Sequence, residues 1–106
     1  MTYRVVYNPE VYHDIQEAVD WYNSQQPGLG KRFFLLLKET LKALPHSANH
    51  FAVRYDNIRC MPLKKFPFLI HYQIVSNQKI IHVEAILSTY RNPATLAERT
   101  SSLPEK

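Results

Sequence analysis

The sequence contains little cysteine, little glycine and no long apolar run. Cys60 is the single cysteine among the 106 residues, so an internal disulfide is excluded and a cytoplasmic protein is the simplest expectation. The two glycines, Gly28 and Gly30, are too few to build a phosphate-binding or dinucleotide-binding glycine loop. Because there is neither a secretory signal nor an apolar run near the ~20 residues that span a bilayer, we expect no contact with a membrane.

The length and the absence of linkers or repeats indicate one small domain. A chain of 106 residues buries enough surface to fold without disulfides. We expect one domain over residues 1–93 and a short polar tail over residues 94–106, with a short helix near residues 93–99 as its only periodic feature.

The positive charge is unevenly distributed. The formal net charge is +4, and residues 1–53 hold five Lys or Arg against five Asp or Glu, whereas residues 54–106 hold eight against four. We therefore expect the second half to meet an acidic partner, such as nucleic acid, the ribosome or an acidic protein segment.

The first half of the chain predicts a strand followed by two helices. Residues 3–7 are rich in β-branched and aromatic types, and Asn8 and Pro9 then provide a helix cap and a first helical residue. Apolar residues recur at helical spacing up to residues 26–28 and again up to Pro45, which predicts a helical hairpin. The expected stripes are Val11, Ile15, Ala18, Val19 and Tyr22 in the first helix, and Leu29, Phe33, Leu36, Leu37, Thr40, Leu41 and Leu44 in the second.

The two helices differ in charge. The first carries the acids Glu10, Asp14, Glu17 and Asp20 and no Lys or Arg, whereas the second carries Lys31, Arg32, Lys38 and Lys42 with only Glu39. We interpret this as complementary packing of solvated edges rather than as a binding patch, because exposed pairs contribute well under ~1 kcal/mol.

The second half predicts strands near residues 52–63, 67–75 and 79–88, with a turn at residues 76–78. The expected fold is α+β, in the order β-α-α-β-β-β, with an antiparallel twisted sheet covered on one face by the helical hairpin. An even-residue turn would pair His71 with His82 or Glu84 across two strands. The other face of the sheet is expected to be exposed.

Alternation along the strands predicts which side chains occupy that exposed face. Cys60 is expected to share the apolar face with Ile58 and to be an inert buried thiol. The residues expected on the exposed face are Arg59, Met61, His71, Gln73, His82 and Glu84, with Lys64, Lys65 and Arg91 at the strand ends.

Two kinds of chemistry are conceivable on this face. His71, His82 and Glu84 are of metal-binding types, but no zinc-site spacing accompanies them, and we predict no metal site. A metal-free cleavage of phosphodiesters needs cations for the phosphate and a proton carrier. Arg59, Lys64, Lys65 and Arg91 would supply the first, and His71, His82 or Tyr90 the second. The alternative is that these cations are solvated or pair with an acidic partner.

Several segments resemble a known family when taken in order. Residues 63–74, with the run Phe66-Pro67-Phe68-Leu69-Ile70-His71-Tyr72, resemble the third strand of RelE/ParE-type toxins of bacterial toxin-antitoxin modules, and Tyr90-Arg91-Asn92-Pro93 resembles the end of their last strand. Residues 18–22, 27–30 and Phe33 extend the resemblance over about residues 3–93.

The resemblance implies a toxin without cofactors that is held inactive in a hetero-oligomer by a cognate antitoxin, whose C-terminal segment wraps around it. In this family, ParE-like members inhibit DNA gyrase and RelE-like members cleave mRNA on the ribosome. In the first case, Arg59, Lys64, Lys65, His71, His82 and Arg91 would bind the target or the antitoxin. In the second, Arg59, Lys64, Lys65, His71, Tyr90 and Arg91 would be catalytic.

The chain departs from the ribonuclease branch in two places. RelE-like nucleases resemble one another in an arginine in the third strand, where this chain has Leu69. They also place a tyrosine or histidine near the C-terminus, and residues 94–106 contain neither. These departures favour the ParE-like reading, with DNA gyrase as the expected target and ribosome-bound mRNA as the alternative.

Overall fold

The computed structural model describes residues 3–90 of the chain. Arg91, the Arg-Asn-Pro sequence that begins with it, and the expected tail with its short helix lie outside the described residues. The elements are β1 (Arg4–Tyr7), α1 (Glu10–Gln25), α2 (Leu29–Ser47), the short 3-10 helix η1 (Ala48–His50), β2 (Val53–Tyr55), β3 (Ile58–Pro62), β4 (Phe68–Val75), the 3-10 helix η2 (Ser76–Gln78) and β5 (Ile80–Ser88). No helix among residues 3–90 is long and apolar enough to cross a membrane.

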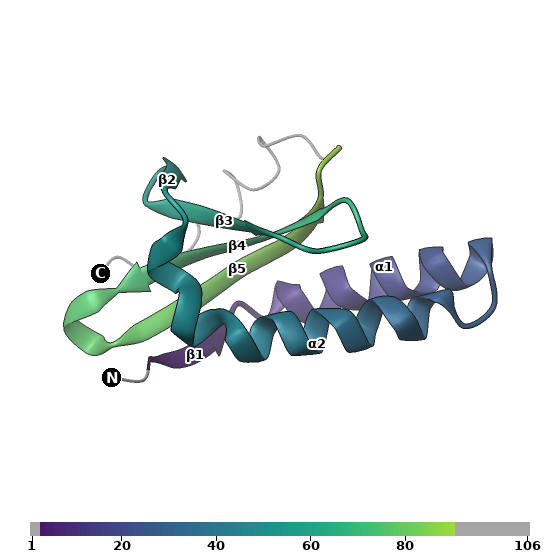
Figure 1. Cartoon of the computed structure of the whole chain (residues 1–106), viewed down its shortest axis with the longest axis horizontal. Coiled ribbons are helices and arrows are strands. Elements are labelled where there is room, and N and C mark those ends of the chain that lie inside the picture. Colours follow the sequence, from purple (N-terminus) through teal and green to yellow (C-terminus); the bar gives the residue numbers. More distant parts are fainter. Residues whose placement is uncertain (1–2, 91–106) are drawn as a thin grey trace.

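The strands form one five-stranded sheet in the order β1-β5-β4-β3-β2, and the α1-α2 hairpin covers one of its faces (Figure 1). The expected α+β class and helical cover are confirmed. The sheet is mixed rather than purely antiparallel, because β1 pairs with β5 in parallel. The connection between these two strands includes the helical hairpin and also β2, β3 and β4, so it is far longer than the dozen or so residues that a parallel pair requires.

The single strand expected over residues 52–63 is in fact two strands. β2 and β3 pair antiparallel around Asp56 and Asn57, which have φ angles of 45° and 65°. Asp and Asn tolerate this left-handed conformation, which two-residue hairpin turns favour. Their side-by-side occurrence explains why the chain reverses here.

Local sequence signals account for the ends of the helices. The Asn8 Oδ1 atom accepts a hydrogen bond from the Glu10 amide at 2.9 Å, so Asn8 caps α1 as expected. α2 continues two residues beyond Pro45, where a stop was predicted. Proline has a helical φ, and although it lacks a donor and its ring crowds the carbonyl of the preceding turn, α2 forms its last turn around Pro45.

The buried apolar stripes of the helices pack on one face of the sheet, as the helical spacing predicted. The core contains Val11, Ala18, Tyr22, Phe33, Leu37 and Leu44 from the helices, and Leu63, Ile70, Tyr72, Ile81, Val83 and Ile86 from the sheet and its turns. Because apolar burial is the dominant favourable term in folding, this layer holds the helices and the sheet together.

A β-bulge changes the register between β4 and β5. Tyr72 pairs with Val83, but His71 pairs with Ala85, so that Glu84 is the extra residue of the bulge. The expected pairing of His71 with His82 or Glu84 is therefore wrong. Near the η2 turn, Gln73 is the residue opposite His82.

The face of β3 is also reversed from the prediction. Arg59 pairs with Tyr72 and Met61 pairs with Ile70, which places both on the helix-covered side, whereas Cys60 pairs with His71 on the other side. Alternation failed here because both faces of the sheet carry apolar residues, including a second cluster of Ala85 and Leu87 against Tyr55.

The second face is not the exposed surface that was expected. Six of its residues are buried, namely Ile58, Cys60, His71, Glu84, Ala85 and Leu87. Glu84 has no exposed area, and His71 retains only 9 %. His71 and Glu84, which were expected on an exposed face, are therefore enclosed.

The hairpin depends on a close approach of α1 and α2 at Gly30. Its amide donates to the Asn23 Oδ1 atom at 2.8 Å, and a Cβ atom at this position would lie 2.4 Å from the Val19 carbonyl oxygen. Gly28, at the turn itself, has a φ of 88° and open space around it. The two glycines thus serve different requirements, one of space and one of conformation.

We predict that Gly30→Ala lowers the free energy of unfolding by about 1–3 kcal/mol, because the added methyl group forces the helices apart. Urea unfolding measures this loss. Gly28→Asn is the matched control and should stay within about 0.5 kcal/mol of the wild type, since Asn tolerates positive φ. Equal stability of the two variants would contradict the close approach.

Tyr72 ties the sheet to the end of α2. Its hydroxyl donates to the Ala48 carbonyl oxygen at 2.6 Å, and its side chain is fully buried. Burial raises the pKa of Tyr72 to about 12, from an ordinary value of 10. The neutral phenol is therefore the form that the fold requires.

We predict that Tyr72 contributes to alkaline unfolding. A pKa raised in the folded state gives stability that is complete below pH 10 and is lost as the pH rises toward about 12. Tyr72→Phe should flatten the fall of the unfolding free energy in this window, measured by urea unfolding between pH 8 and pH 12. Tyr12→Phe, at an exposed position, should keep the wild-type slope, and an unchanged slope in Tyr72→Phe would refute this role.

Candidate functional site

The basic turn between β3 and β4 projects from one end of the sheet. Lys64 and Lys65 are exposed, and Lys65 has a φ of 71°. Hydrogen bonds from the Leu63 amide to the Phe68 carbonyl and from the Phe68 amide to the Phe66 carbonyl, at 3.0 and 2.8 Å, hold the turn. Both lysines are therefore presented to solvent by a structured loop.

The end of β5 lies beside this turn. The Thr89 amide donates to the Pro67 carbonyl oxygen at 2.8 Å, and Tyr90 follows with 86 % of its area exposed. The structure thus places Lys64, Lys65 and Tyr90 at the same end of the sheet. Arg91 was predicted from the sequence as a further member of this group, and it is the first residue beyond the described range.

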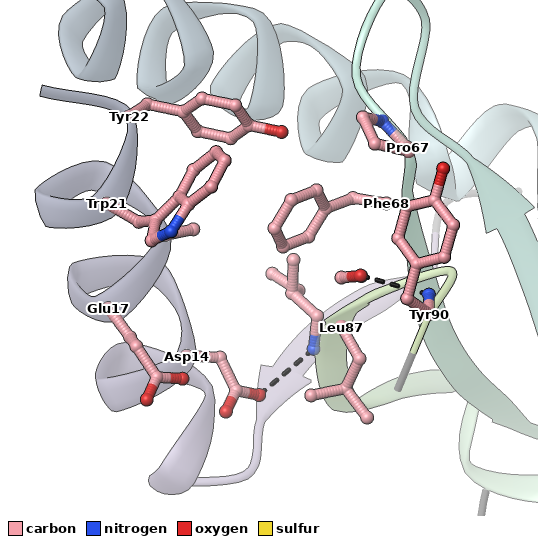
Figure 2. A pocket seen from close by; sticks show the side chains of 11 residues that line it. Asp14, Glu17, Trp21, Tyr22, Pro67, Phe68, Leu87 and Tyr90 are labelled. Carbon is pink, nitrogen blue, oxygen red and sulfur yellow. Dashed lines mark hydrogen bonds between the residues drawn. The ribbon is translucent and has the colours of Figure 1, made fainter. Parts of the chain in front are cut away.

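A pocket of about 410 Å³ opens at this end, between α1 and the ends of β4 and β5 (Figure 2). The α1 side of the pocket consists of Asp14, Glu17, Ala18, Trp21 and Tyr22, and the opposite side of Pro67, Phe68, Ile86, Leu87, Ser88 and Tyr90. Its volume lies in the range of pockets that hold small ligands or side chains.

Aromatic rings form one wall of the pocket. The Trp21 and Tyr22 ring centroids are 5.1 Å apart in an edge-to-face arrangement, and Tyr22 and Phe68 are 6.0 Å apart. Burial, together with the nearby Tyr90 hydroxyl, raises the pKa of Tyr22, so its phenol stays protonated. Trp21 remains 58 % exposed at the rim.

Carboxylates from α1 form another part of the lining. Asp14 is only 4 % exposed, and its Oδ2 atom accepts a hydrogen bond from the Ile86 amide at 3.0 Å. Glu17, nearly one turn further along α1, is exposed. The expectation that these acids are solvated edges is wrong for Asp14, which joins α1 to β5.

The sequence reasoning did not identify this pocket. A signal was present, because Asp14, Ala18 and Trp21 are spaced to lie on one side of a helix, and Trp21 was left outside the predicted apolar stripe. What no pattern shows is the gap between that side of α1 and the end of β5.

The other predicted site residues lie away from the turn. The Arg59 Nη1 atom donates to the Phe51 carbonyl oxygen at 2.6 Å, on the helix-covered side of the sheet. This bond ties the guanidinium to the loop before β2. Arg59 is therefore engaged within the fold and is not on the face that the sequence suggested.

His71 belongs to a buried polar group on the second face. Its Nδ1 atom lies 2.9 Å from the Tyr55 hydroxyl and 3.4 Å from the Cys60 Sγ atom. Burial raises the pKa of both the Tyr55 hydroxyl and the Cys60 thiol, the latter against the opposing effect of Arg54. Both groups are thus protonated near neutral pH, and the thiol is not activated as a nucleophile.

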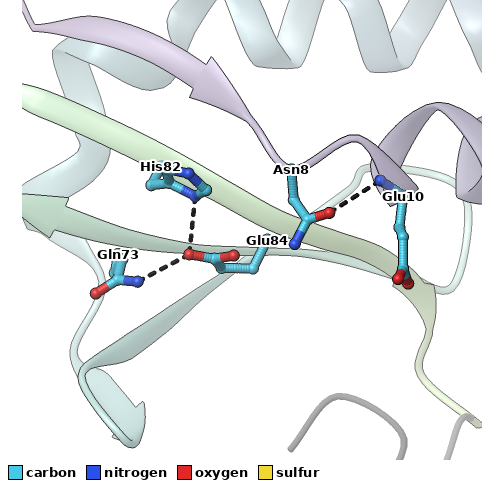
Figure 3. Close-up of polar contacts among 5 residues, drawn as sticks. All are labelled: Asn8, Glu10, Gln73, His82 and Glu84. Atoms are coloured by element: carbon cyan, nitrogen blue, oxygen red, sulfur yellow. Dashed lines mark hydrogen bonds and ion pairs between the residues drawn. The ribbon is translucent and has the colours of Figure 1, made fainter. Parts of the chain in front are cut away.

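His82 belongs to a different group on that face (Figure 3). The Glu84 Oε2 atom lies 2.9 Å from the His82 Nδ1 atom and accepts a hydrogen bond from the Gln73 Nε2 atom at 2.8 Å. His71 and His82 therefore have separate sets of contacts. Within residues 3–90, no group of three His, Cys, Asp or Glu side chains is arranged to hold a metal ion.

Comparison with solved structures identifies the fold as that of toxins from toxin-antitoxin systems. A chain of the chromosomal ParDE system from P. aeruginosa superposes with a TM-score of 0.72 at 20 % identity, covering 82 % of this chain and 96 % of that one. A mutant of the E. coli toxin RelE in the free state gives a TM-score of 0.64 at 11 % identity, covering 97 % and 100 %. At such identities the likeness shows the fold.

The family follows from the sequence itself. The family described as the ParE toxin of the type II toxin-antitoxin system parDE matches residues 5–93. The chain therefore belongs to the ParE family of type II toxins, in agreement with the resemblance found in its motifs. A search among curated proteins finds no matching sequence.

We predict that Asp14→Ala lowers the free energy of unfolding by about 1–3 kcal/mol, because the buried Ile86 amide loses its acceptor. Asp14→Asn, which keeps an acceptor oxygen, should lose less. Glu17→Ala is the control on the exposed neighbouring acid and should stay within about 0.5 kcal/mol of the wild type. If Asp14→Ala unfolds at the wild-type urea concentration, Asp14 does not join the helix to the sheet.

Proposed function

We propose that this toxin inhibits DNA gyrase and that a cognate antitoxin neutralises it. The observation that carries the proposal is the match to the ParE family over residues 5–93. The P. aeruginosa relative comes from a ParDE system, which supports a partner of the antitoxin type for this chain as well. Gyrase and such an antitoxin would meet the toxin in the cytoplasm.

The arrangement of the predicted catalytic residues supports binding over ribonuclease chemistry. Phosphodiester cleavage needs the phosphate clamp and the proton carrier within hydrogen-bond reach of one reacting group. Arg59 is bound to a loop carbonyl on the helix side, and His71 is buried with Tyr55 and Cys60 on the other side. These two residues do not share a site with Lys64 and Lys65.

The contact surface that we assign to the target is the basic turn. Lys64 and Lys65 are exposed on a hydrogen-bonded loop, and their charge attracts acidic surfaces over several ångströms. A loop that is already ordered loses little conformational entropy on binding. The turn is thus suited to grip a protein target without chemistry.

A RelE-like activity is the second candidate. The E. coli RelE structure covers nearly the whole chain, and Lys64, Lys65 and Tyr90 lie at one end of the sheet. In that case the lysines would hold the phosphate, and the Tyr90 hydroxyl would transfer the proton.

We predict that the purified toxin blocks supercoiling of relaxed plasmid by gyrase and leaves ribosome-bound mRNA intact. Lys64→Ala/Lys65→Ala should raise the half-inhibitory concentration about tenfold or more, since losing charge-assisted contacts worth about 1.5–3 kcal/mol each has at least that effect. Lys42→Ala, an exposed charge on α2, is the matched control and should inhibit like the wild type.

Two outcomes would change the assignment. Unaltered supercoiling at saturating toxin would exclude the gyrase proposal. Cuts in ribosome-bound mRNA that disappear in Lys64→Ala/Lys65→Ala and in Tyr90→Phe would establish the RelE-like activity instead.

A further inference from the structure

We propose that the solvent-facing side of α2 around Leu35 binds an acidic amphipathic helix of a partner protein. The Leu35 side chain is 48 % exposed. Residues three and four positions away are its neighbours on the helix surface, and here they are Lys31, Arg32, Lys38 and Glu39, all of them exposed. These five residues are the Leu35 patch.

The Leu35 patch faces away from the sheet and from the basic turn. Phe33 is fully buried, and its ring centroid is 5.2 Å from that of Phe66 in the basic turn. Leu35 follows two residues later, about 200° further around the helix, so it points to the opposite side of α2. Because α2 belongs to the helical layer on one face of the sheet (Figure 1), that side meets solvent. The chain therefore has two separate basic surfaces.

The cations of the Leu35 patch do not serve the fold. In the part of the chain that the structure describes, no ion pair joins Lys31, Arg32 or Lys38 to an acid. The first turn of α2 contains Lys31 and Arg32 and no acid, although positive charge is unfavourable at the positive end of a helix dipole. We infer that this charge is directed at a partner, and the partner must be acidic.

The apolar centre of the patch favours a polypeptide over nucleic acid. Phe34, 38 % exposed, adjoins Leu35, and the Lys38 Nζ atom lies 5.8 Å from the centroid of the Phe34 ring. Lysine stems also cover apolar surface, so these three side chains form one apolar strip bordered by positive charge. A phosphate backbone has no apolar groups to place on such a strip, and Glu39 repels it.

The spacing of the patch favours a helical partner. Lys31, Leu35 and Lys38 follow one another at intervals of four and three residues, the repeat along which two helices pack. A second helix can therefore lay an apolar stripe on Leu35 while its acids pair with the cations on either side. Opposite Glu39 that helix needs a neutral or basic residue, which restricts the registers in which it can bind.

The test uses a peptide with the proposed chemistry. The probe is a fluorescein-labelled peptide of three repeats of Glu-Leu-Ala-Gln-Leu-Glu-Ala, whose leucines form one stripe of a helix with glutamates beside it. It is titrated into the full-length toxin while its fluorescence anisotropy is recorded. The neutral control has glutamine in place of every glutamate. We expect saturable binding of the acidic peptide that weakens with added salt, and binding of the neutral peptide that is weaker by about tenfold or more.

Four variants assign the binding to the Leu35 patch. Lys38→Glu should weaken binding of the acidic peptide about tenfold or more, whereas Arg4→Glu, the same change of charge at an exposed position of β1, should alter it less than about twofold. Glu39→Gln should strengthen it, because a like charge is removed. Leu35→Ala should weaken binding of both peptides. Urea unfolding checks that all four proteins are folded.

The proposal is overturned if both peptides bind equally, if neither binds saturably, or if Lys38→Glu and Arg4→Glu have the same effect. An RNA duplex that binds more tightly than the acidic peptide and is lost in Lys38→Glu would assign the patch to nucleic acid instead. A dimer that Leu35→Ala dissociates would assign it to a second copy of this chain. Gyrase does not enter the titration, so this proposal and the gyrase proposal can fail separately.

Discussion

The contact on which the rest of the structure depends is a cluster of four aromatic rings between the hairpin and the basic turn. Tyr22 of α1 and Phe33 of α2 are 5.3 Å apart, and each packs against Phe66 and Phe68, with centroid distances between 4.9 and 6.0 Å. Each such pair adds about 0.5–1.5 kcal/mol to the burial of its surface. The cluster fixes the loop that carries Lys64 and Lys65 on the helices, and Tyr22 and Phe68 extend it into the pocket wall. The basic turn and the pocket are therefore both positioned by one packed core rather than by flexible segments.

Helical periodicity predicted the hairpin well, because each helix buries one stripe and exposes the rest. The strands were harder to place on a face. Ile58 and Cys60 are apolar, yet they belong to the side of the sheet away from the helices, which also buries Leu87. Where both faces are buried, alternation no longer says which face meets the helices. The bulge at Glu84 then shifts the partner of His71 by one position, to Ala85. Such an extra residue leaves no mark in the alternation of apolar and polar residues.

Only the local part of the candidate site, the basic turn, could be predicted from the sequence, and the reason is related. The basic turn is a local feature, so its lysines and their exposure followed from the residues around Pro67. The pocket is a tertiary feature made by Asp14 and Trp21 of one segment and by Leu87 and Tyr90 of another. Asp14 resembled a solvated helix residue because its acceptor role toward the Ile86 amide depends on a contact between distant segments.

The parallel pairing of β1 with β5 also sets the order in which the protein can form. Arg4 pairs with Ile80 and Tyr7 with Val83. β1 therefore has no partner strand until β5, near the end of the described chain, has been synthesised. Pairings between segments this distant form late and slowly, because loop closure must be completed before they add stability. The α1-α2 hairpin and the β2-β3 turn are local and can form on the growing chain. A nascent copy therefore lacks the finished sheet, which gives the cell an interval in which the protein exists but is not yet in its native form.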